Sequence, residues 1–311
     1  MAGHSYERDL SGYGRNPPDP RWPGGARIAV QFVVNFEEGG ERSVLHGDAT
    51  SEAFLTDVIG AQPWQGQRHM NVESMFEYGS RAGFWRLWRL FQDRQLKATV
   101  FGVATALERN KEVVSAMREA QWEIASHGLK WIDYKDFSET DERAHMAEAI
   151  RIHTAVTGER PLGWYTGRNS GHTLKAVLDD GGFLYSSDSY ADDLPYWVKG
   201  PTGPHLIIPY SLDTNDMRFI NAQGFASGDD FYAYLRDSFD VLYAEGEGTP
   251  KMMSIGLHCR LAGRPGRFAA LTRFFDHIAT HDKVWVATRL DIARHWHREH
   301  MGLAKNAQVV M

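Results

Sequence analysis

Short apolar runs alternate with amphipathic stretches along most of this chain. The apolar runs predict β-strands over residues 26–36, 97–103, 122–126, 162–166, 183–187, 205–210, 252–258 and 284–287. Between them, apolar residues recur with helical spacing and predict helices over 80–95, 108–120, 138–157, 171–181, 229–243, 265–280 and 288–298. Strands and helices that alternate in this way indicate parallel strands joined by crossover helices. This number of strands favours an α/β fold closed into a barrel.

Two segments break this alternation. Residues 1–25 show no periodicity and contain the stretch NPPDPRWPGG, which predicts an extended N-terminal arm lying on the body of the protein or on a neighbouring subunit. Residues 40–79 form a long connection with little regular pattern, and such connections are often lids or binding loops. An insertion that makes a subunit contact remains an alternative for 40–79. We expect residues 26–311 to form a single barrel domain.

Charge and cysteine content exclude several classes of protein. The 311 residues carry a net charge of −6 and no basic stripe, which argues against nucleic acid or an anionic membrane as partner. A single cysteine, Cys259, rules out an intrachain disulfide and fits a reducing compartment. The N-terminus, MAGHSYERDL, is too polar for a secretory signal, and no apolar run reaches membrane-spanning length. These features predict a cytoplasmic protein.

Residues suited to catalysis follow several of the predicted strands. In α/β barrels the active site gathers at the carboxyl ends of the strands, so these positions meet on one rim. Two histidines, two glutamates, an arginine and several aromatic residues there could supply an acid, a base and hydrogen-bond donors. The rim candidates are Asn35, Glu37, Glu38, His127, Trp131, Tyr165, Arg168, Trp197 and His258.

Simpler interpretations compete at some of these positions. An adjacent pair such as Glu37 and Glu38 often marks only a solvated strand end. We interpret Cys259 as a buried small apolar residue, because neighbouring strand residues face opposite ways. His295 and His297 lie two residues apart on a predicted helix and therefore point to different faces, which argues against a metal site there.

The ordered motifs NFEEG, SHGLKW, GWYTGR, DSYADDLPYW and SIGLHC resemble those of the polysaccharide deacetylase family. The resemblance covers the chain from about residue 26 onward and implies a distorted (β/α) barrel. Within the family, VVNFEEG, ESMFEYGSRAGFWR and SHGLKW are most similar to the cofactor-independent allantoinases of bacterial purine breakdown. That similarity implies hydrolysis of the hydantoin ring of allantoin, a ureide, to allantoate. It also implies a homo-oligomer, a tetramer.

The motifs depart from the deacetylase pattern at the metal ligands. Where the family usually has two aspartates, this chain has Glu37 and Glu38. Of the two metal-binding histidines four residues apart, His127 is present and the second position holds Trp131, which cannot bind a metal. A catalytic divalent site usually takes three protein ligands, and at most two remain. We therefore expect neither a metal nor another cofactor.

These residues suggest a hypothesis for the chemistry. Glu37 would act as general base toward the attacking water, and His258 would protonate the departing ring nitrogen. Glu38 would hold His127 or a ring N–H of the substrate. The ordinary pKa values of glutamate and histidine place the pH range of activity on the acid side of neutrality. Neighbouring carboxylates would raise both the acid limit, set by Glu37, and the alkaline limit, set by His258.

The remaining candidates are expected to bind substrate. Asn35 and Arg168, with backbone N–H groups, would stabilise the oxyanion. Trp131 would pack against the flat ring, and Tyr165 and Trp197 would line the site.

Two other functions remain open at this point. A metal-dependent cyclic imide hydrolase or deacetylase of the same fold would recruit Glu38, His127 and a third ligand such as His46 or His69. A non-catalytic sugar-binding protein is the other alternative, although the retained carboxylates and histidines argue against it.

Overall fold

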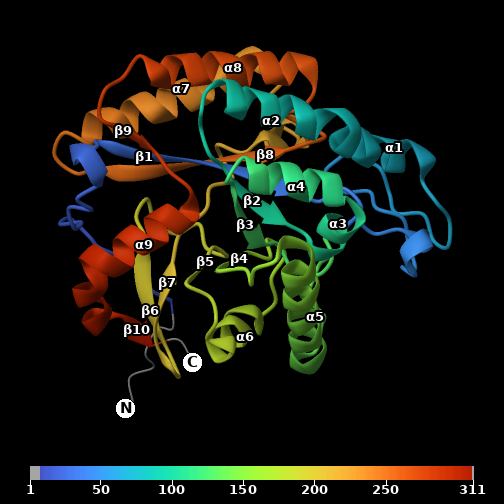
Figure 1. Ribbon diagram of the computed structural model, residues 1–311, viewed down its shortest axis with the longest axis horizontal. Helices are drawn as coiled ribbons and strands as arrows, with labels where there is room; N and C mark the ends of the chain where they lie inside the picture. The colour runs from blue at the N-terminus through green and yellow to red at the C-terminus, as the bar shows by residue number, and fades with distance from the viewer. Residues whose placement is uncertain (1–7, 310–311) are drawn as a thin grey trace.

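The structure is a computed structural model that describes residues 8–309 (Figure 1). Its strands are β1 (Ile28–Phe36), β2 (Thr99–Gly102), β3 (Glu123–Ser126), β4 (Gly163–Trp164), β5 (Tyr185–Ser186), β6 (Tyr196–Gly200), β7 (Gly203–Ile207), β8 (Lys251–His258), β9 (Val284–Val286) and β10 (Gln308–Val309). Its α-helices are α1 (Met70–Tyr78), α2 (Phe84–Asp93), α3 (Ala104–Arg109), α4 (Lys111–Glu119), α5 (Glu139–Thr157), α6 (Thr173–Asp180), α7 (Gly228–Glu245), α8 (Pro265–Ala279) and α9 (Arg289–His300).

All ten strands of the described region join one curved sheet. Nine follow the order β10-β6-β7-β5-β4-β3-β2-β1-β8, and β9 pairs with β1 outside this order. β1 is its most connected strand. One edge of β1 pairs with β8 along almost its whole length, while the other edge pairs first with β9 and then with β2. The pairing is parallel throughout except between β6 and β7.

The sheet does not close completely, because β7 and β8 approach each other without a continuous series of hydrogen bonds between them. A single parallel bridge, Asn215 to Gly256, connects the segment after β7 to β8. The expected distorted α/β barrel is therefore confirmed, with its gap on the side between β7 and β8.

Every strand expected from the apolar runs is present. The prediction missed β6, β10 and α1, which are short or carry a weak pattern. It also placed one helix over 108–120, where the chain forms α3 and α4 in succession. They divide at Asn110, whose side chain accepts a hydrogen bond from the Val113 amide at 3.2 Å and caps α4.

The largest core cluster lies between the sheet and the helices α2, α7 and α8, which run together along one side of β1 and β8 (Figure 1). Phe32 of β1 is fully buried there. It stacks on Phe275 of α8 with ring centroids 4.4 Å apart, and it meets Phe91 of α2 edge-on at 5.5 Å. Because every residue of β1 is buried, its apolar run is continuous rather than alternating. This packing fixes the strand that carries Asn35 and leads directly into Glu37.

A buried arginine fills the interior of the barrel. Arg289, the first residue of α9, donates to Gln31 Oε1 at 2.7 Å, Ser254 Oγ at 3.0 Å and Ser187 Oγ at 2.9 Å. It also donates to the carbonyl oxygens of Ile208 and Pro209. One guanidinium thus connects β1, β8, the end of β5 and the segment after β7.

The described part of the N-terminal arm, residues 8–25, packs on the body near α9. Trp22 is buried against Trp285 and Trp296, and its Nε1 donates to Lys251 O at 3.1 Å. Tyr13 donates its hydroxyl proton to Pro195 O at 2.7 Å. Of the expected arm, residues 1–7 lie outside the described residues.

Residues 40–79 contain more order than their sequence suggests. They include α1, which continues through a π-helical turn, Gly79–Gly83, into α2. Phe54 and Leu55 from this segment line the cavity described below. The segment therefore builds part of a binding site.

Among residues 8–309, every helix is too short or too polar to span a lipid bilayer.

Candidate active site

The two glutamates that follow β1 point in different directions, as adjacent residues leaving a strand do. Both are almost completely buried, with 1% of Glu37 and 3% of Glu38 exposed. Glu37 lines a cavity at the carboxyl ends of the strands. Glu38 does not line it and accepts a hydrogen bond from the Glu37 amide at 3.1 Å.

Arg260, two residues beyond the end of β8, holds both carboxylates. Its Nη2 donates to Glu37 Oε2 at 2.7 Å, and its Nη1 lies 3.5 Å from Glu38 Oε1. Its Nε donates to Leu55 O at 3.0 Å, so the guanidinium also anchors the 40–79 segment. Arg260 is 1% exposed and lies over the rings of Phe76 and Trp131, at 4.2 and 5.0 Å from their centroids.

This arrangement gives the two glutamates opposite acidities. Burial works to raise the pKa of Glu37, but the charges of Arg260 and His258 and hydrogen bonds from two histidines outweigh it and hold that pKa well below the usual value. Burial also raises the pKa of Glu38, and the nearby charge of Glu37 adds to the effect, against the opposing influence of Arg260. Glu37 is therefore the member of the pair that stays ionised.

His258, the last residue of β8, lies between two carboxylates. Its Nδ1 is 2.6 Å from Asp216 Oδ1, and its Nε2 is 3.3 Å from Glu37 Oε1. Asp216 is fully buried and also accepts hydrogen bonds from the backbone amides of His258 and Ala262. Burial alone would lower the pKa of His258, but the charges of Glu37 and Asp216 raise it to about 9. The imidazole is thus protonated at neutral pH.

His127 approaches Glu37 as well. It follows β3, and its Nε2 lies 3.4 Å from Glu37 Oε1. Its ring packs beside Tyr165, with centroids 4.9 Å apart. Its Nδ1 is buried and has no hydrogen-bond partner in the described structure. Both histidines therefore direct Nε2 toward the same carboxylate oxygen, at the long end of hydrogen-bonding distance.

These groups line a cavity of about 390 Å³. The cavity brings together residues from β1 and β8, from the loops after β3, β4 and β5, from the segment after β7, and from the 40–79 segment. Its walls are formed by Asn35, Glu37, Phe54, Leu55, His127, Trp131, Asp133, Tyr165, Gly167, Arg168, Tyr190, Tyr210, Leu212, Asn215, Met217 and His258.

One wall is a stack of aromatic rings and an arginine. Phe54 and Trp131 stack with centroids 5.7 Å apart and planes 25° from parallel. The Arg168 guanidinium lies over both rings, 4.6 Å from Phe54 and 4.0 Å from Trp131. Its Nη2 is buried and has no hydrogen-bond partner among the described residues. Arg168 thus adds a positive charge, fixed against two rings, to this wall of the cavity.

Amide and hydroxyl groups form another part of the wall. Asn35 Nδ2 donates to Tyr210 Oη at 3.1 Å and to Leu257 O at 3.3 Å. Asn215 Nδ2 donates to the same tyrosine oxygen at 3.2 Å. Tyr165 Oη lies 3.1 Å from Tyr190 Oη. This wall could recognise a ligand that carries several carbonyl and N–H groups.

Most of the sequence-based candidates meet in this cavity, but two do not. Glu38 lies behind Glu37 against Arg260, and the expected contact with His127 is made by Glu37 instead. Trp197 belongs to β6, whose antiparallel pairing with β7 carries it into a separate core cluster, where its Nε1 donates to His300 O at 3.0 Å. Assigning Trp197 to the substrate site was therefore wrong.

The catalytic metal of deacetylases does not fit these residues. The cation between Glu37 and Glu38 is the side chain of Arg260, and Trp131 occupies the position of the second histidine ligand. The ligand atoms of Glu37, His127 and His258 do not all lie within 4.8 Å of one another. The third ligands considered from sequence are elsewhere: His69 caps α1 and stacks on Trp64, and His46 does not line the cavity.

Sequence reasoning missed Arg260 and Asp216. The position of Arg260, two residues after a rim histidine, was an available signal. Asp216 gave none, because it starts a 3₁₀ turn, Asp216–Ile220, after a stretch without periodicity. Two minor expectations are confirmed: Cys259 is fully buried in the core, and His295 and His297 make separate contacts with Pro20 O and Leu184 O.

Comparison with known proteins agrees with this fold. Residues 66–179 match the family model for polysaccharide deacetylase. A Schizosaccharomyces pombe protein named as a polysaccharide deacetylase is 45% identical over 94% of this chain and 98% of its own length.

Two crystal structures are also similar along nearly the whole chain. That of PuuE allantoinase is 60% identical with a TM-score of 0.95, covering 96% of this chain and 99% of the other. That of a Pseudomonas aeruginosa protein, described as a polysaccharide deacetylase, is 62% identical with a TM-score of 0.93, covering 95% and 99%.

Proposed function

The chain belongs to the polysaccharide deacetylase family, and we propose that it acts there as an allantoinase that hydrolyses a cyclic amide without a catalytic metal. The observation that carries this proposal is the position of Glu37. One of its oxygens is fixed by Arg260, and the other faces the cavity between His127 and His258.

Glu37 would accept the proton of the attacking water. Its Oε2 is held by Arg260 at 2.7 Å, so the carboxylate cannot rotate away while Oε1 is presented to the cavity. The Oε1 contacts with the two histidines, at 3.3 and 3.4 Å, are long for hydrogen bonds, so Oε1 would still be able to accept a proton from a water molecule that enters from the cavity. General base catalysis of this kind contributes about 10²–10⁴-fold.

His258 would donate a proton to the leaving nitrogen. Its charge is stabilised by Asp216 on one side, and its Nε2 lies on the same side of the cavity as Glu37 Oε1. The water oxygen forms the new bond to the carbonyl carbon, and the ring C–N bond then breaks as the nitrogen takes the proton of His258. The products are an open-chain N–H and a carboxylic acid, which becomes the carboxylate by releasing the second proton of the water to solvent, and the proton held by Glu37 restores His258.

Fixed donors would stabilise the oxyanion that forms at the carbonyl. Arg168 lines the cavity, and its Nη2, which is buried in this structure, has no protein partner among the described residues. Asn215 adds an amide donor, because only one of its Nδ2 hydrogens is used, toward Tyr210, whereas both Nδ2 hydrogens of Asn35 are already donated to Tyr210 Oη and Leu257 O. A single donor of this type is typically worth about 3–4 kcal/mol in the transition state.

The cavity also suits a small ureide. Its stacked Phe54 and Trp131 can cover a flat ring, while the amides, hydroxyls and Arg168 match the many carbonyl and N–H groups of a hydantoin. The similarity to PuuE allantoinase over nearly the whole chain supports the same substrate.

Turnover assays with and without a chelator test this proposal. We expect purified protein to convert allantoin to allantoate at the same rate when EDTA is present, and Glu37→Gln to remove that activity. The comparison substrate is an N-acetylated glucosamine oligomer, assayed for acetate with and without added zinc. Release of acetate that depends on zinc, without allantoate formation, would overturn the proposal. Lack of turnover on both substrates would favour a binding protein.

A further inference from the structure

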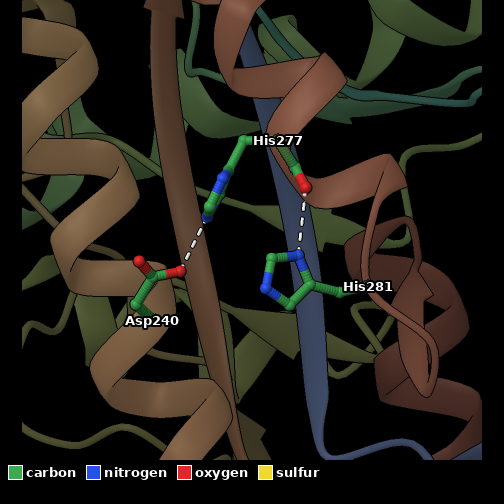
Figure 2. Close-up of side chains that lie close together, drawn as sticks. All are labelled: Asp240, His277 and His281. Atoms are coloured by element: carbon green, nitrogen blue, oxygen red, sulfur yellow. Dashed lines mark hydrogen bonds and ion pairs between the residues drawn. The ribbon is translucent and has the colours of Figure 1, made fainter.

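Two helices on the side of the sheet away from the catalytic cavity bring a carboxylate and two histidines together. Asp240 lies on α7, His277 lies in the last turn of α8, and His281 follows two residues after that helix ends (Figure 2). One ligand atom from each of the three lies within 4.8 Å of the other two. All three side chains are partly exposed, and none lines the catalytic cavity.

The hydrogen bonds of His281 leave one of its nitrogens free to bind a metal. Its Nδ1 lies 3.0 Å from His277 O, a carbonyl that can only accept, so Nδ1 carries the hydrogen. The lone pair is then on Nε2, and Figure 2 shows the ring nitrogen that carries no dashed line turned toward Asp240. Metal-binding histidines usually donate their second N–H to a carbonyl or carboxylate in this way.

His277 is held just as firmly. Its Nε2 lies 2.7 Å from Asp240 Oδ1, so the two ligand atoms already face each other and share one proton. A metal ion with N and O ligands at about 2.0–2.2 Å would replace that proton after a small rotation of the side chains.

Aromatic side chains support both imidazoles. Phe239 of α7 packs edge-on against His277 and His281, with centroids 5.6 and 5.0 Å away. Tyr243, one turn further along, contacts His281 in the same way at 5.0 Å. Tyr243 is itself fixed by donating its hydroxyl proton to Asp282 at 2.6 Å. The ring orientations are therefore set by packing before any ion binds.

We propose that Asp240, His277 and His281 form a zinc site that fastens the end of α8 to α7. Two imidazole nitrogens and one carboxylate oxygen are typical zinc ligands, and a water molecule would complete a tetrahedron. Mg²⁺ and Ca²⁺ prefer ligand sets made only of oxygen, so they would compete poorly. The site stands apart from the catalytic residues, and the proposal does not depend on which reaction they perform.

The bound ion would also hold the connection to β9. His281 lies in the short link between α8 and β9, and β9 pairs with the first half of β1. A metal that joins this link to α7 would therefore stabilise the edge of the sheet, and the melting temperature should rise with zinc concentration.

Titration of the chelator-stripped full chain with Zn²⁺ against a competing chromophoric chelator tests the proposal. We expect one equivalent to bind, with at least about a 100-fold loss of affinity in His281→Ala, more than the 10–100-fold typical of changes to groups around a metal site. Substitution with Co²⁺ should give the visible absorption of a tetrahedral ion in the parent protein, and this absorption should be absent from the variant.

Two control variants separate this site from other histidines. His172→Ala removes a partly exposed histidine at the start of α6 and should bind Zn²⁺ like the parent. His127→Ala removes a cavity histidine and should also retain the site. The melting temperature of metal-free His281→Ala confirms that it is folded. Undiminished binding in His281→Ala, or a loss of binding in His127→Ala alone, would overturn the proposal.

Discussion

At the scale of single residues, the site depends on the different surroundings of two neighbouring glutamates, which shift their pKa values in opposite directions. Glu37 is tied to Arg260 and faces two histidines, whereas Glu38 is buried behind it with a raised pKa. Like charges side by side in a dry site are costly, and one guanidinium offsets that cost while Glu37 is the member of the pair that stays ionised.

Glu37→Gln should lower kcat at least about 100-fold, because the amide cannot accept a proton from water. Steady-state turnover of allantoin measures the effect. Glu41→Gln is the matched control: Glu41 is also buried, its pKa is raised to about 7, mainly by burial, and it does not line the cavity. Near-normal turnover by folded Glu37→Gln would remove Glu37 from the mechanism.

The pH dependence follows from the two shifted groups. Activity requires ionised Glu37, whose pKa lies well below 4.5, and protonated His258, whose pKa is about 9. The kcat/KM profile should therefore be flat through neutrality and fall near pH 9, rather than peak on the acid side as the ordinary values suggest.

Asp216→Asn removes a charge that raises the pKa of His258, so the alkaline limit should move down from about 9. The same kcat/KM profile, recorded on folded protein, measures the shift. An alkaline limit that stays in place would show that another residue supplies the proton.

Arg260→Met tests the acid side of the same profile. Without the guanidinium the pKa of Glu37 should rise, so the acid limit should move to higher pH and become measurable. Loss of one partner from a buried ion pair should also reduce the free energy of unfolding by about 3–5 kcal/mol. Denaturant unfolding and pH–rate profiles measure the two effects. An unchanged acid limit would contradict the role given to Arg260.

At the scale of elements, the turn between α1 and α2 shows why the glutamates fit where they do. The π-helical turn begins and ends with glycines, Gly79 and Gly83. A Cβ at Gly79 would overlap the Glu38 carboxylate, and one at Gly83 would overlap the carbonyl of Cys259. This helix therefore approaches the active-site strands so closely that side chains are excluded.

Gly79→Ala should destabilise the protein by about 1–3 kcal/mol, as overpacking of a buried contact does, and should displace Glu38. Urea unfolding measures the change. Gly266→Ala, in the first turn of α8, is the control: its Cβ would meet nothing within 4 Å, so stability should stay the same or rise by about 0.4–1 kcal/mol. Equal stability of the two variants would contradict the close approach.

The elements also show how far sequence reasoning reaches. Continuous apolar runs revealed strands such as β1 and β8, because strands buried on both faces need them. β6 was missed because it is a short hairpin strand with a mixed pattern of buried and exposed residues, and Trp197 was misplaced with it.

For the site, strand ends alone were enough to bring Asn35, Glu37, His127 and His258 to one cavity. Asp216 and Arg260 could not be identified as site residues by their position at a strand end. Their importance comes from their contacts with Glu37 and His258, residues far away in sequence, and the position of Arg260 after a rim histidine does not by itself reveal that contact.

At the scale of the whole molecule, the interior of the barrel is held together by hydrogen bonds from the buried side chain of Arg289 as well as by apolar packing. Arg289→Met keeps similar volume but leaves several buried acceptors unpaired, among them Gln31 Oε1 and the Ile208 carbonyl. Each such group costs about 1–3 kcal/mol, so the free energy of unfolding should fall by more than about 3 kcal/mol.

Chemical denaturation measures the free energy of unfolding of Arg289→Met, and Arg273→Met is the control variant. Arg273 forms an exposed ion pair with Asp229, and its loss should cost no more than about 1 kcal/mol. Similar losses for both variants would show that Arg289 is not a structural hub.

The central position of β1 has a consequence for how the protein is made. The strand leaves the ribosome early, yet Ile28 pairs with Lys251 and Val284, roughly 220 residues or more further along. At a synthesis rate of about 5–20 residues per second, β1 waits on the order of 10–50 s for its partners. During that time its apolar run has only β2 and the helices of the first half to cover it. The nascent chain therefore exposes the unpaired backbone N–H and C=O groups of β1 until synthesis is almost complete. It should depend on chaperones during that interval.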